Sequence, residues 1–363
     1  MSKKIVIIVW KESQFQNSWV GKYIWNYIPY LKENFNVEIF YQPEKHWMVS
    51  WFYWRIFTLP KIIKKEYKDY IKVFYDENFL ISVRPKYAKS TIVIVHHYPF
   101  KTKVTNLKEH IIRWLSFITF NTILRKIHHI VVVSNKTKET LKEIWIKEKY
   151  ITVIPNSVDI SYYKVLNEEE KNKKRENISK KYKVPMDKKW LLYVWSNESR
   201  KNLLTLFKVL SKLSDDYILV RVWKDWGTEE LEKMNKIINE NNLKNRYYHL
   251  QDLSEEDLIS LYQVSDVYLM PSLYEWFGRP IIEAQACWCP VISTKCWALE
   301  EVCGDWALLI NNPMNEEDYI EKIMELQNVK VSESLIKKWL ENSKKYATDL
   351  NAAKYINLIS QFN

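Results

Sequence analysis

Short runs of apolar, β-branched residues recur along the chain, separated by stretches with helical periodicity. A run that is apolar at every position indicates a strand buried on both faces, as in a parallel sheet. In the first part of the chain such runs fall at 3–9, 71–75, 91–96, 129–134 and 151–154. Helical patterns lie between several of them, at about 20–33, 107–126 and 135–144. Because strands alternate with helices, this part predicts a parallel sheet covered on both faces.

The same alternation restarts after a charged stretch. Residues 166–189 are rich in Lys and Glu and poor in apolar residues, which predicts a linker between domains. Beyond it, strands are predicted at 191–195, 217–222, 247–250, 267–272, 290–294 and 307–310. Helices are predicted at 201–213, 228–241, 254–264, from about 280, and at 316–327.

The pattern therefore predicts an α/β protein with two doubly wound, Rossmann-like domains. The predicted boundaries are an N-terminal domain at 1–165, the charged linker at 166–189, a C-terminal domain at 190–332 and C-terminal helices at 333–363. The last helices can return to the N-terminal domain. Folds of this kind bind ligands at the carboxyl ends of their strands, so we expect a central cleft that the two sheets face.

Length and composition narrow the class of protein. A chain of 363 residues with 47% apolar residues is too long for a disulfide mini-scaffold and too apolar for a disordered chain. The longest uncharged apolar run, 114–124, lies between Arg113 and Arg125 and is shorter than the ~18–20 residues of a membrane span. The N-terminus enters a strand directly, without a secretory signal pattern. We expect a cytoplasmic protein, with peripheral attachment to the inner face of the membrane as an option.

The cysteines and the charge are unevenly distributed. Cys287, Cys289, Cys296 and Cys303 lack the paired C-x-x-C spacing of zinc ribbons, so we expect reduced structural thiols and no metal. Residues 1–160 carry 26 Lys and Arg against 13 Asp and Glu, whereas the whole chain has a net charge of +11. The basic half, with its aromatic run at 47–65, suits an anionic membrane surface or a lipid-linked acceptor. The alternative is a solvated basic face; no nucleic-acid-binding module is visible, so we expect no nucleic acid partner.

The segment 271–294, PSLYEWFGRPIIEAQACWCPVIST, is the most informative stretch. A predicted strand ends at Pro271, and Pro280 suits the first position of a helix because that position needs no N–H partner. Glu275 then lies in the turn and Glu283 in the first turn of the helix. The free N–H groups of a helix start suit a diphosphate, and a carboxylate nearby can accept from ribose hydroxyls. On spacing alone, two glutamates eight residues apart favour a solvated helix face with a negative charge near the helix N-terminus.

Glu275-x7-Glu283, in this setting, resembles the signature of the family 4 retaining glycosyltransferases, also called glycosyl transferases group 1, which have the GT-B fold. Supporting motifs run along the whole chain. They are SWVG (18–21), IVIVHHYPF (92–100), VVVSNKTKETL (131–141), ITVIPNSVD (151–159), YVWSNESRKNL (193–203), SEEDLISLYQVSDVYLMPSLYE (254–275) and ALEEVCGDWALLI (298–310). The run YVWSNESRKNL is most similar to the mannosyltransferase-type subgroup.

The resemblance implies roles for individual residues. Arg200 and Lys201 match the cations that bind the donor diphosphate, with Phe277, Gly278, Trp19 and Gly21 in the matching loops. Glu283 matches the ribose ligand. Glu275 matches the glutamate near the transferred sugar, and His96 matches a histidine that faces this sugar. The alternatives from the residues themselves are a basic helix start for Arg200 and Lys201 and a hydrogen-bonded structural histidine for His96.

The resemblance also implies a reaction. Such enzymes move a hexose, here of the mannose or glucose type, from a nucleoside-diphosphate sugar to a glycan or lipid-linked acceptor in cell-surface polysaccharide or glycolipid synthesis. They retain the anomeric configuration and need neither a cofactor nor a metal, in keeping with the lack of an Asp-x-Asp motif here. We expect front-face attack, in which the departing phosphate oxygen helps to deprotonate the acceptor hydroxyl. The alternative function is a non-catalytic binder of sugar nucleotides.

Tryptophan stands where the family has glycine. The chain has 4 Gly and 17 Trp, against roughly 25 Gly expected at the usual ~7%. Eleven tryptophans occupy family glycine positions: Trp10, Trp19, Trp145, Trp195, Trp223, Trp226, Trp276, Trp288, Trp297, Trp306 and Trp339. We hypothesise that these are glycines encoded by UGA, written as Trp under a different genetic code. The alternatives are a true Trp-rich protein and an altered or inactive one.

Overall fold

The computed structural model describes residues 3–9, 23–43, 53–96, 121–225, 227–328, 338 and 341–362. The chain forms two compact units. Unit 1 comprises Met1–Ser157 and Thr348–Asn363, and unit 2 comprises Val158–Ala347. The chain therefore passes between the units twice, at Ser157–Val158 and at Ala347–Thr348.

Unit 1 is built on a six-stranded sheet in the order β2-β1-β3-β4-β5-β6, with every neighbouring pair parallel. Its strands are β1 (Lys4–Val9), β2 (Asn36–Tyr41), β3 (Ile71–Phe74), β4 (Thr91–Val95), β5 (His129–Val132) and β6 (Ile151–Val153). Ile5 pairs with Val37 of β2 on one side and with Ile71 of β3 on the other. The five strands predicted from apolar runs are all present. Strand β2 was not predicted because it lies at the sheet edge and mixes polar with apolar residues.

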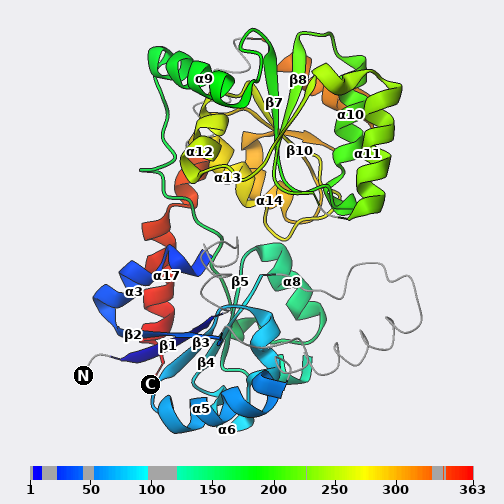
Figure 1. Cartoon of the computed structure of the whole chain (residues 1–363). Coiled ribbons are helices and arrows are strands. Elements are labelled where there is room, and N and C mark those ends of the chain that lie inside the picture. The colour runs from blue at the N-terminus through cyan, green and yellow to red at the C-terminus, as the bar shows by residue number, and fades with distance from the viewer. Residues whose placement is uncertain are drawn as a thin grey trace. The chain divides into compact units, whose positions relative to one another are not determined.

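Short helices cover this sheet (Figure 1). They are α3 (Ile28–Asn34), the π-helix η1 (Trp54–Thr58), α5 (Leu59–Glu66), η2 (Glu77–Ser82), α6 (Pro85–Ala88), α8 (Asn135–Glu143) and η4 (Glu148–Tyr150). Helix α8 begins where Ser134 accepts a hydrogen bond from the backbone N–H of Thr137. It confirms the helix predicted at 135–144. Residues 20–22 and 107–120 of the other two predicted helices lie outside the described residues.

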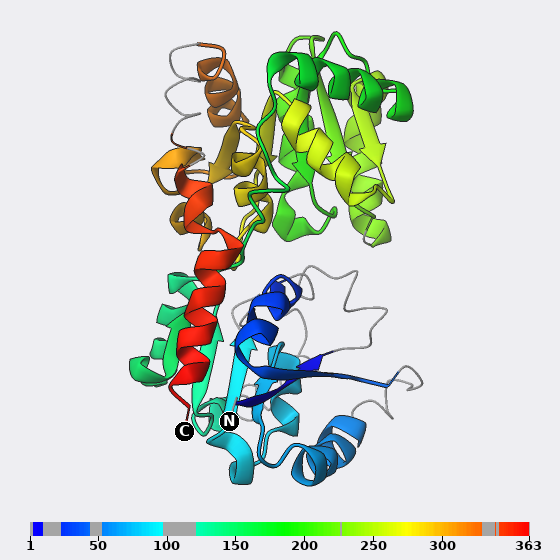
Figure 2. The same ribbon diagram turned by 90° about the vertical axis from the view of Figure 1, so that its left-hand side faces the viewer.

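The C-terminal helix belongs to unit 1. Helix α17 (Thr348–Ser360) packs beside α3 (Figures 1 and 2). The hydroxyls of Tyr355 and Tyr23 are 2.6 Å apart in the buried interface, and the Tyr355 ring packs on Tyr27. Lys3 donates a hydrogen bond of 2.7 Å to the carbonyl of Ser360. These contacts tie the two ends of the chain to one domain.

Unit 2 contains a second six-stranded parallel sheet in the order β12-β11-β10-β7-β8-β9. The strands are β7 (Lys189–Val194), β8 (Tyr217–Val222), β9 (Tyr247–Leu250), β10 (Val267–Met270), β11 (Val291–Thr294) and β12 (Leu308–Ile310). From β7 the chain builds outward through β8 to β9, and it then returns to the other side of β7 as β10. The order of strands therefore reverses between β7 and β10, where folds of this kind bind ligands.

Helices cover both faces of this sheet, as the sequence predicted (Figure 1). They are α10 (Leu203–Lys212), α11 (Thr228–Glu240), α12 (Glu255–Val264), α13 (Arg279–Ala286), α14 (Leu299–Cys303) and α15 (Glu316–Glu325), with the 3-10 turns η5 (Ser199–Lys201), η6 (Leu243–Asn245) and η7 (Gly304–Trp306). Helices α10 and α11 lie on one face, and α12 and α13 lie on the other. The core includes Phe207, Leu269 and Tyr319.

The linker predicted at 166–189 is corrected by the structure. Most of it forms helix α9 (Glu168–Tyr182), which packs on α12 within unit 2. Asn167 and Glu170 form a capping box at its start. Arg175 donates to the carbonyl of Val264 and stacks its guanidinium on the Trp190 ring at 4.6 Å. Long charged side chains thus attach a helix with little apolar surface, a role that a hydrophobicity pattern does not show.

No helix within the described ranges has the length and apolar character needed to cross a membrane.

Candidate functional site

The switch point of the second sheet brings together two loops that are far apart in sequence. After β7 the chain forms the turn η5, which carries Arg200 and Lys201. After β10 it forms the turn that carries Glu275. The backbone N–H of Leu273 donates to the carbonyl of Arg200 at 2.8 Å and joins the two loops. The first candidate site is therefore a product of the strand order.

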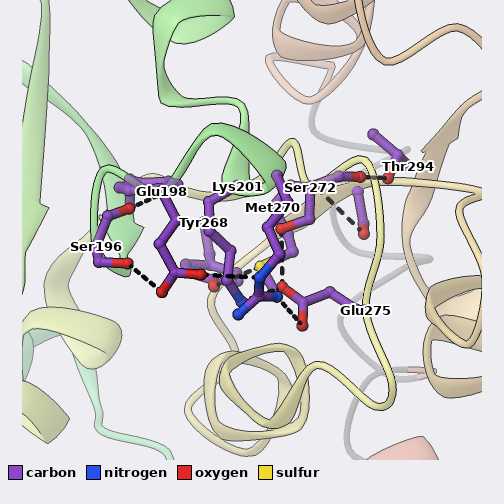
Figure 3. A network of polar contacts seen from close by, with 11 residues as sticks. Ser196, Glu198, Lys201, Tyr268, Met270, Ser272, Glu275 and Thr294 are labelled. Atoms are coloured by element: carbon purple, nitrogen blue, oxygen red, sulfur yellow. Dashed lines mark hydrogen bonds and ion pairs between the residues drawn. The ribbon is translucent and has the colours of Figure 1, made fainter. Parts of the chain in front are cut away.

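Lys201 and Glu275 form a buried ion pair at this point (Figure 3). The Lys201 ammonium donates a hydrogen bond to Glu275 Oε1, and its side chain is fully buried. Arg200 Nη1 lies 3.6 Å from Glu275 Oε2, and the Arg200 side chain is 38% exposed. The structure thus brings together three of the residues that the sequence singled out, one cation buried and the other open to solvent.

Burial changes the proton affinity of Lys201. Loss of hydration lowers the pKa of Lys201 to about 7, although the Glu275 carboxylate opposes this shift. An ammonium with a pKa near 7 loses or gains its charge within the physiological range. Its charged state therefore depends on what anion shares the site.

Further polar contacts hold the two loops in place. Ser272 Oγ donates to Glu275 Oε1 at 3.0 Å, and Thr294 Oγ1 donates to the Ser272 carbonyl at 2.7 Å. Glu198 accepts from Ser196 at 3.0 Å and from Arg200 Nε at 2.9 Å. Ser272 and Glu198 were not predicted as site residues from the sequence. They lie close to Arg200 and Glu275 in the sequence, but this closeness does not tell a residue that bonds to the site from one that is exposed to solvent.

Glu283 lies in a separate buried network. Arg279 Nε lies 2.8 Å from Glu283 Oε1, and the hydroxyls of Tyr163 and Tyr262 donate to the carboxylate at 3.3 and 3.1 Å. The residue is 1% exposed. Burial, followed by the charge of Glu283, raises the pKa of both tyrosines, so both hydroxyls remain donors. The structure shows an anchored carboxylate here, and the ribose role of Glu283 stays a prediction.

The loop between the two glutamates ends at the start of α13. Gly278 has a φ of 90° and precedes the helix, and an added Cβ would lie 2.6 Å from Leu299 Cδ2. Only glycine fits that backbone without strain. Phe277 is buried against the Tyr346 ring, with centroids 5.5 Å apart. Their expected part in diphosphate binding stays a prediction, and Trp19 and Gly21 lie outside the described residues.

His96 lies in unit 1, just after β4. Its ring Nε2 is 2.8 Å from the carbonyl of Tyr75, which only accepts, so Nε2 carries the hydrogen. Its backbone N–H donates to Glu77 at 3.0 Å, and Tyr23 packs edge-on against the ring at 4.8 Å. These contacts agree with the alternative interpretation of His96 as a hydrogen-bonded structural histidine. They also fix the orientation of the ring, and its catalytic role stays a prediction.

The cysteines form no disulfide. Cys287, Cys289 and Cys303 are buried, and burial raises the pKa of Cys303 to about 12. A thiol with such a pKa is a poor nucleophile at neutral pH. In the described segments, no group of three or more His, Cys, Asp or Glu side chains is arranged to hold a metal ion.

Comparison with known families identifies the class of protein. The sequence model of Glycosyl transferases group 1 matches residues 174–346, and that of Glycosyltransferase Family 4 matches residues 27–162. The chain belongs to the family 4 glycosyltransferases of the GT-B fold. The resemblance drawn from its motifs is thereby confirmed.

Several relatives are mannosyltransferases. The serotype-specific mannosyltransferase WbdA of Escherichia coli is 29% identical over 155 residues, which cover 41% of this chain and 18% of that protein. The O-antigen chain mannosyltransferase RfbU of Salmonella typhimurium is 26% identical over 207 residues, which cover 57% of this chain and 53% of that protein. In both comparisons the matched region spans less than two thirds of the relative.

Solved structures match the whole chain. Anabaena Alr3699/HepE, in complex with UDP and glucose, superposes with a TM-score of 0.76 at 14% identity and covers 99% of both chains. A glycosyltransferase from Rickettsia africae superposes with a TM-score of 0.71 at 20% identity and covers 99% of this chain and 98% of that one. At such identities the likeness shows the fold alone, and it confirms the predicted GT-B architecture of two parallel sheets.

Proposed function

We propose that the protein is a retaining hexosyltransferase. It moves a mannose or glucose type sugar from a nucleoside-diphosphate donor to a glycan or lipid-linked acceptor, in the synthesis of cell-surface polysaccharide or glycolipid. The observation that carries this proposal is the buried Lys201 ammonium, paired with Glu275 and flanked by Arg200 at the switch point of the second sheet. A buried cation at the carboxyl ends of parallel strands suits an anionic ligand such as a diphosphate.

The proposed reaction is the one that the family resemblance implies. The bond between the anomeric carbon and the diphosphate oxygen breaks, and a bond from the same face of that carbon to the acceptor oxygen forms. The acceptor proton passes to the departing phosphate oxygen. Lys201 and Arg200 stabilise the negative charge that develops on the diphosphate, while Glu275 positions Lys201 and stabilises positive charge on the sugar. Glu283 binds the ribose, and His96 contacts the donor sugar.

The comparisons support a hexose donor. WbdA and RfbU are named as mannosyltransferases, and the Anabaena protein was solved with UDP and glucose. A nucleoside diphosphate is common to such donors. We therefore propose GDP-mannose and UDP-glucose as the first donors to test.

The test is an assay of donor hydrolysis and transfer with the purified chain. It uses two forms, the sequence as written and a glycine form in which the eleven tryptophans at family glycine positions are replaced by Gly. We expect the glycine form to consume at least one of the two donors and to yield a product with the donor's anomeric configuration. The Glu275→Gln variant should lose this activity, whereas an inverted product would contradict the retaining mechanism.

A second candidate function is a non-catalytic binder of sugar nucleotides. The observation that favours it is the indole of Trp195, which lies over the Lys201 ammonium at 3.4 Å from the ring centroid. If residue 195 is tryptophan in the cell, this ring occupies the approach to the cation. Nucleotide binding by both forms without donor consumption would support this alternative.

We also propose that unit 1 binds an anionic membrane surface peripherally, at the inner face of the membrane. Tyr53 and Phe57 are 61% and 50% exposed, and their rings pack together. They precede three exposed lysines in the sequence, Lys61, Lys64 and Lys65. Aromatic rings beside lysines suit the interface of an anionic bilayer.

Sedimentation with vesicles of anionic and neutral lipid tests this membrane proposal. Reversing Lys64 and Lys65 to Glu should abolish charge-dependent binding, and Lys208→Glu in unit 2 should leave it unchanged.

A further inference from the structure

Four tryptophans have a backbone conformation that suits glycine. The φ angles of Trp145, Trp223, Trp288 and Trp297 are 69°, 124°, 59° and 58°. Side chains with a Cβ rarely adopt such angles because the Cβ approaches the neighbouring carbonyl oxygen. For a residue as bulky as tryptophan, each of these angles is a marked outlier.

The four belong to the eleven tryptophans at family glycine positions. Seven of the eleven lie in the described residues, and four of these seven have a positive φ. Trp25, Trp54 and Trp190 are the described tryptophans outside the eleven, and none of them is among the positive-φ residues. The other non-glycine residues with positive φ are Lys183, Asn202, Asn242 and Asp252, and Asn and Asp tolerate this region better than other types. Among the described tryptophans, a positive φ therefore occurs only at positions where the family has glycine.

A second, independent observation concerns the space around the ion pair. Trp195 covers Lys201, and Trp223 stacks on Trp195 with an interplanar angle of 11° and centroids 6.3 Å apart. Beside Glu275, the rings of Trp276 and Trp297 lie 5.5 Å apart, and both pack on Tyr274. Four of the eleven tryptophans thus gather at the loops that carry Lys201 and Glu275.

We propose that the protein made in its own cells has glycine at residues 145, 195, 223, 276, 288 and 297, because their codons are UGA read as glycine. Chance mutation does not replace one residue type by another at many scattered glycine positions, whereas a change of codon assignment does so at every UGA. The proposal also assigns a binding site. The diphosphate of the sugar donor occupies the space in which the written sequence places the rings of Trp195 and Trp276. The placing of the diphosphate in this space rests on the proposed function. The proposal of glycine at the six positions does not.

The decisive experiment is mass spectrometry of tryptic peptides from the native cells. The peptide 190–200, WLLYVWSNESR, contains Trp190, which is buried in the core, and residue 195. We expect tryptophan at 190 and glycine at 195 in the same peptide. We also expect glycine at 297 in the peptide 296–322. Tryptophan at both 190 and 195, or a UGG codon at 276, would overturn the proposal.

A stability measurement tests the backbone argument without any ligand. Trp288 is 38% exposed with a positive φ, and Trp25 is 44% exposed in a helical segment. Trp288→Gly should raise the thermal midpoint because the strain is relieved, and Trp25→Gly should lower it because glycine weakens a helix. An equal decrease in both variants would contradict the proposal.

The site assignment is tested by titration of UDP and GDP into two forms of the chain. We expect the Trp195→Gly, Trp276→Gly, Trp297→Gly triple variant to bind at least one nucleotide ten times or more tighter than the written chain. Equal affinity would overturn the assignment of the space. If the peptides show glycine but neither form binds or consumes a nucleotide, the residue identities stand and the proposed function fails.

Discussion

The carboxyl ends of the two sheets carry different chemistry, although each sheet has six parallel strands. In unit 2, the loops after β7 and β10 hold the buried pair of Lys201 and Glu275 with Arg200 beside it. In unit 1, His96 follows the end of β4. Its ring is hydrogen-bonded to the carbonyl of Tyr75, and its backbone N–H donates to Glu77. Among the described residues, two cations thus lie beside Glu275 in unit 2, whereas His96 in unit 1 is held by a backbone carbonyl and a carboxylate.

Two sheets of the same kind can therefore differ in the side chains at the carboxyl ends of their strands. A diphosphate needs positive charge, which unit 2 provides at its switch point. In the proposed function, a sugar or an acceptor hydroxyl needs hydrogen-bond partners, and His96 of unit 1 is one of them. Fold alone does not assign these roles, because the strand order of each sheet is compatible with either. Variants at Lys201 and His96 test whether the two edges differ in function.

The largest effect is expected from Lys201→Ala. Loss of the buried cation removes charge stabilisation of the departing diphosphate, and we expect donor consumption by the glycine form to fall about 10²–10³-fold. The measurement is the initial rate at saturating donor. Lys208→Ala, which removes a half-exposed lysine of α10, should keep the parent rate. A Lys201→Ala rate within twofold of the parent would remove the contrast between the two edges.

A smaller effect is expected from His96→Gln. The ring contacts the donor sugar in the proposed function but carries no charge of the leaving group, so we expect kcat to fall about 10–100-fold with little change in nucleotide affinity. Kinetics and nucleotide titration on the same variant measure this. The exposed His128→Gln serves as the control. If kcat is unchanged while the thermal midpoint falls, His96 is a structural residue only.

The pH dependence of donor binding should report Lys201. Because burial lowers its pKa to about 7, the ammonium is charged below that pH and loses its proton above it. We expect the affinity of the written chain for a nucleotide sugar to weaken about tenfold per pH unit above 7, until the pKa of the complex is reached. Titrations between pH 6 and 9 measure this slope. Glycine at 195 should move the transition to higher pH, since water then reaches the ammonium, and Lys201→Ala should have no such slope.

The smallest effect is expected from chelation. Arg200 and Lys201 supply positive charge at the proposed diphosphate site, so we expect EDTA to leave the transfer rate within twofold of the untreated enzyme. Rates with EDTA and with added Mg²⁺ measure this. A tenfold loss that Mg²⁺ restores would show that the two cations do not suffice.

Much of the fold was readable from the sequence because its strands are buried on both faces. Continuous apolar runs predicted eleven of the twelve strands found in the described residues, and the exception was the half-exposed edge strand β2. The charged segment at 166–189 was read as a linker because α9 has a single buried residue, Ile178. Its attachment depends on Lys174 and Arg175, whose hydrogen bonds to α12 no local pattern reveals.

The class of the protein, the alternation of strands and helices, and the candidates Arg200, Lys201, Glu275 and Glu283 could all be inferred from the sequence. It also exposed the imbalance of tryptophan and glycine. The folded chain was needed to show that Lys201 and Glu275, 74 residues apart, form one buried pair, while Glu283 is held elsewhere by Arg279 and two tyrosines. It also decided which tryptophans occupy left-handed backbone. The reason is physical: apolar periodicity is a local property, whereas charge pairing, desolvation and backbone strain depend on which distant segments the strand order brings together.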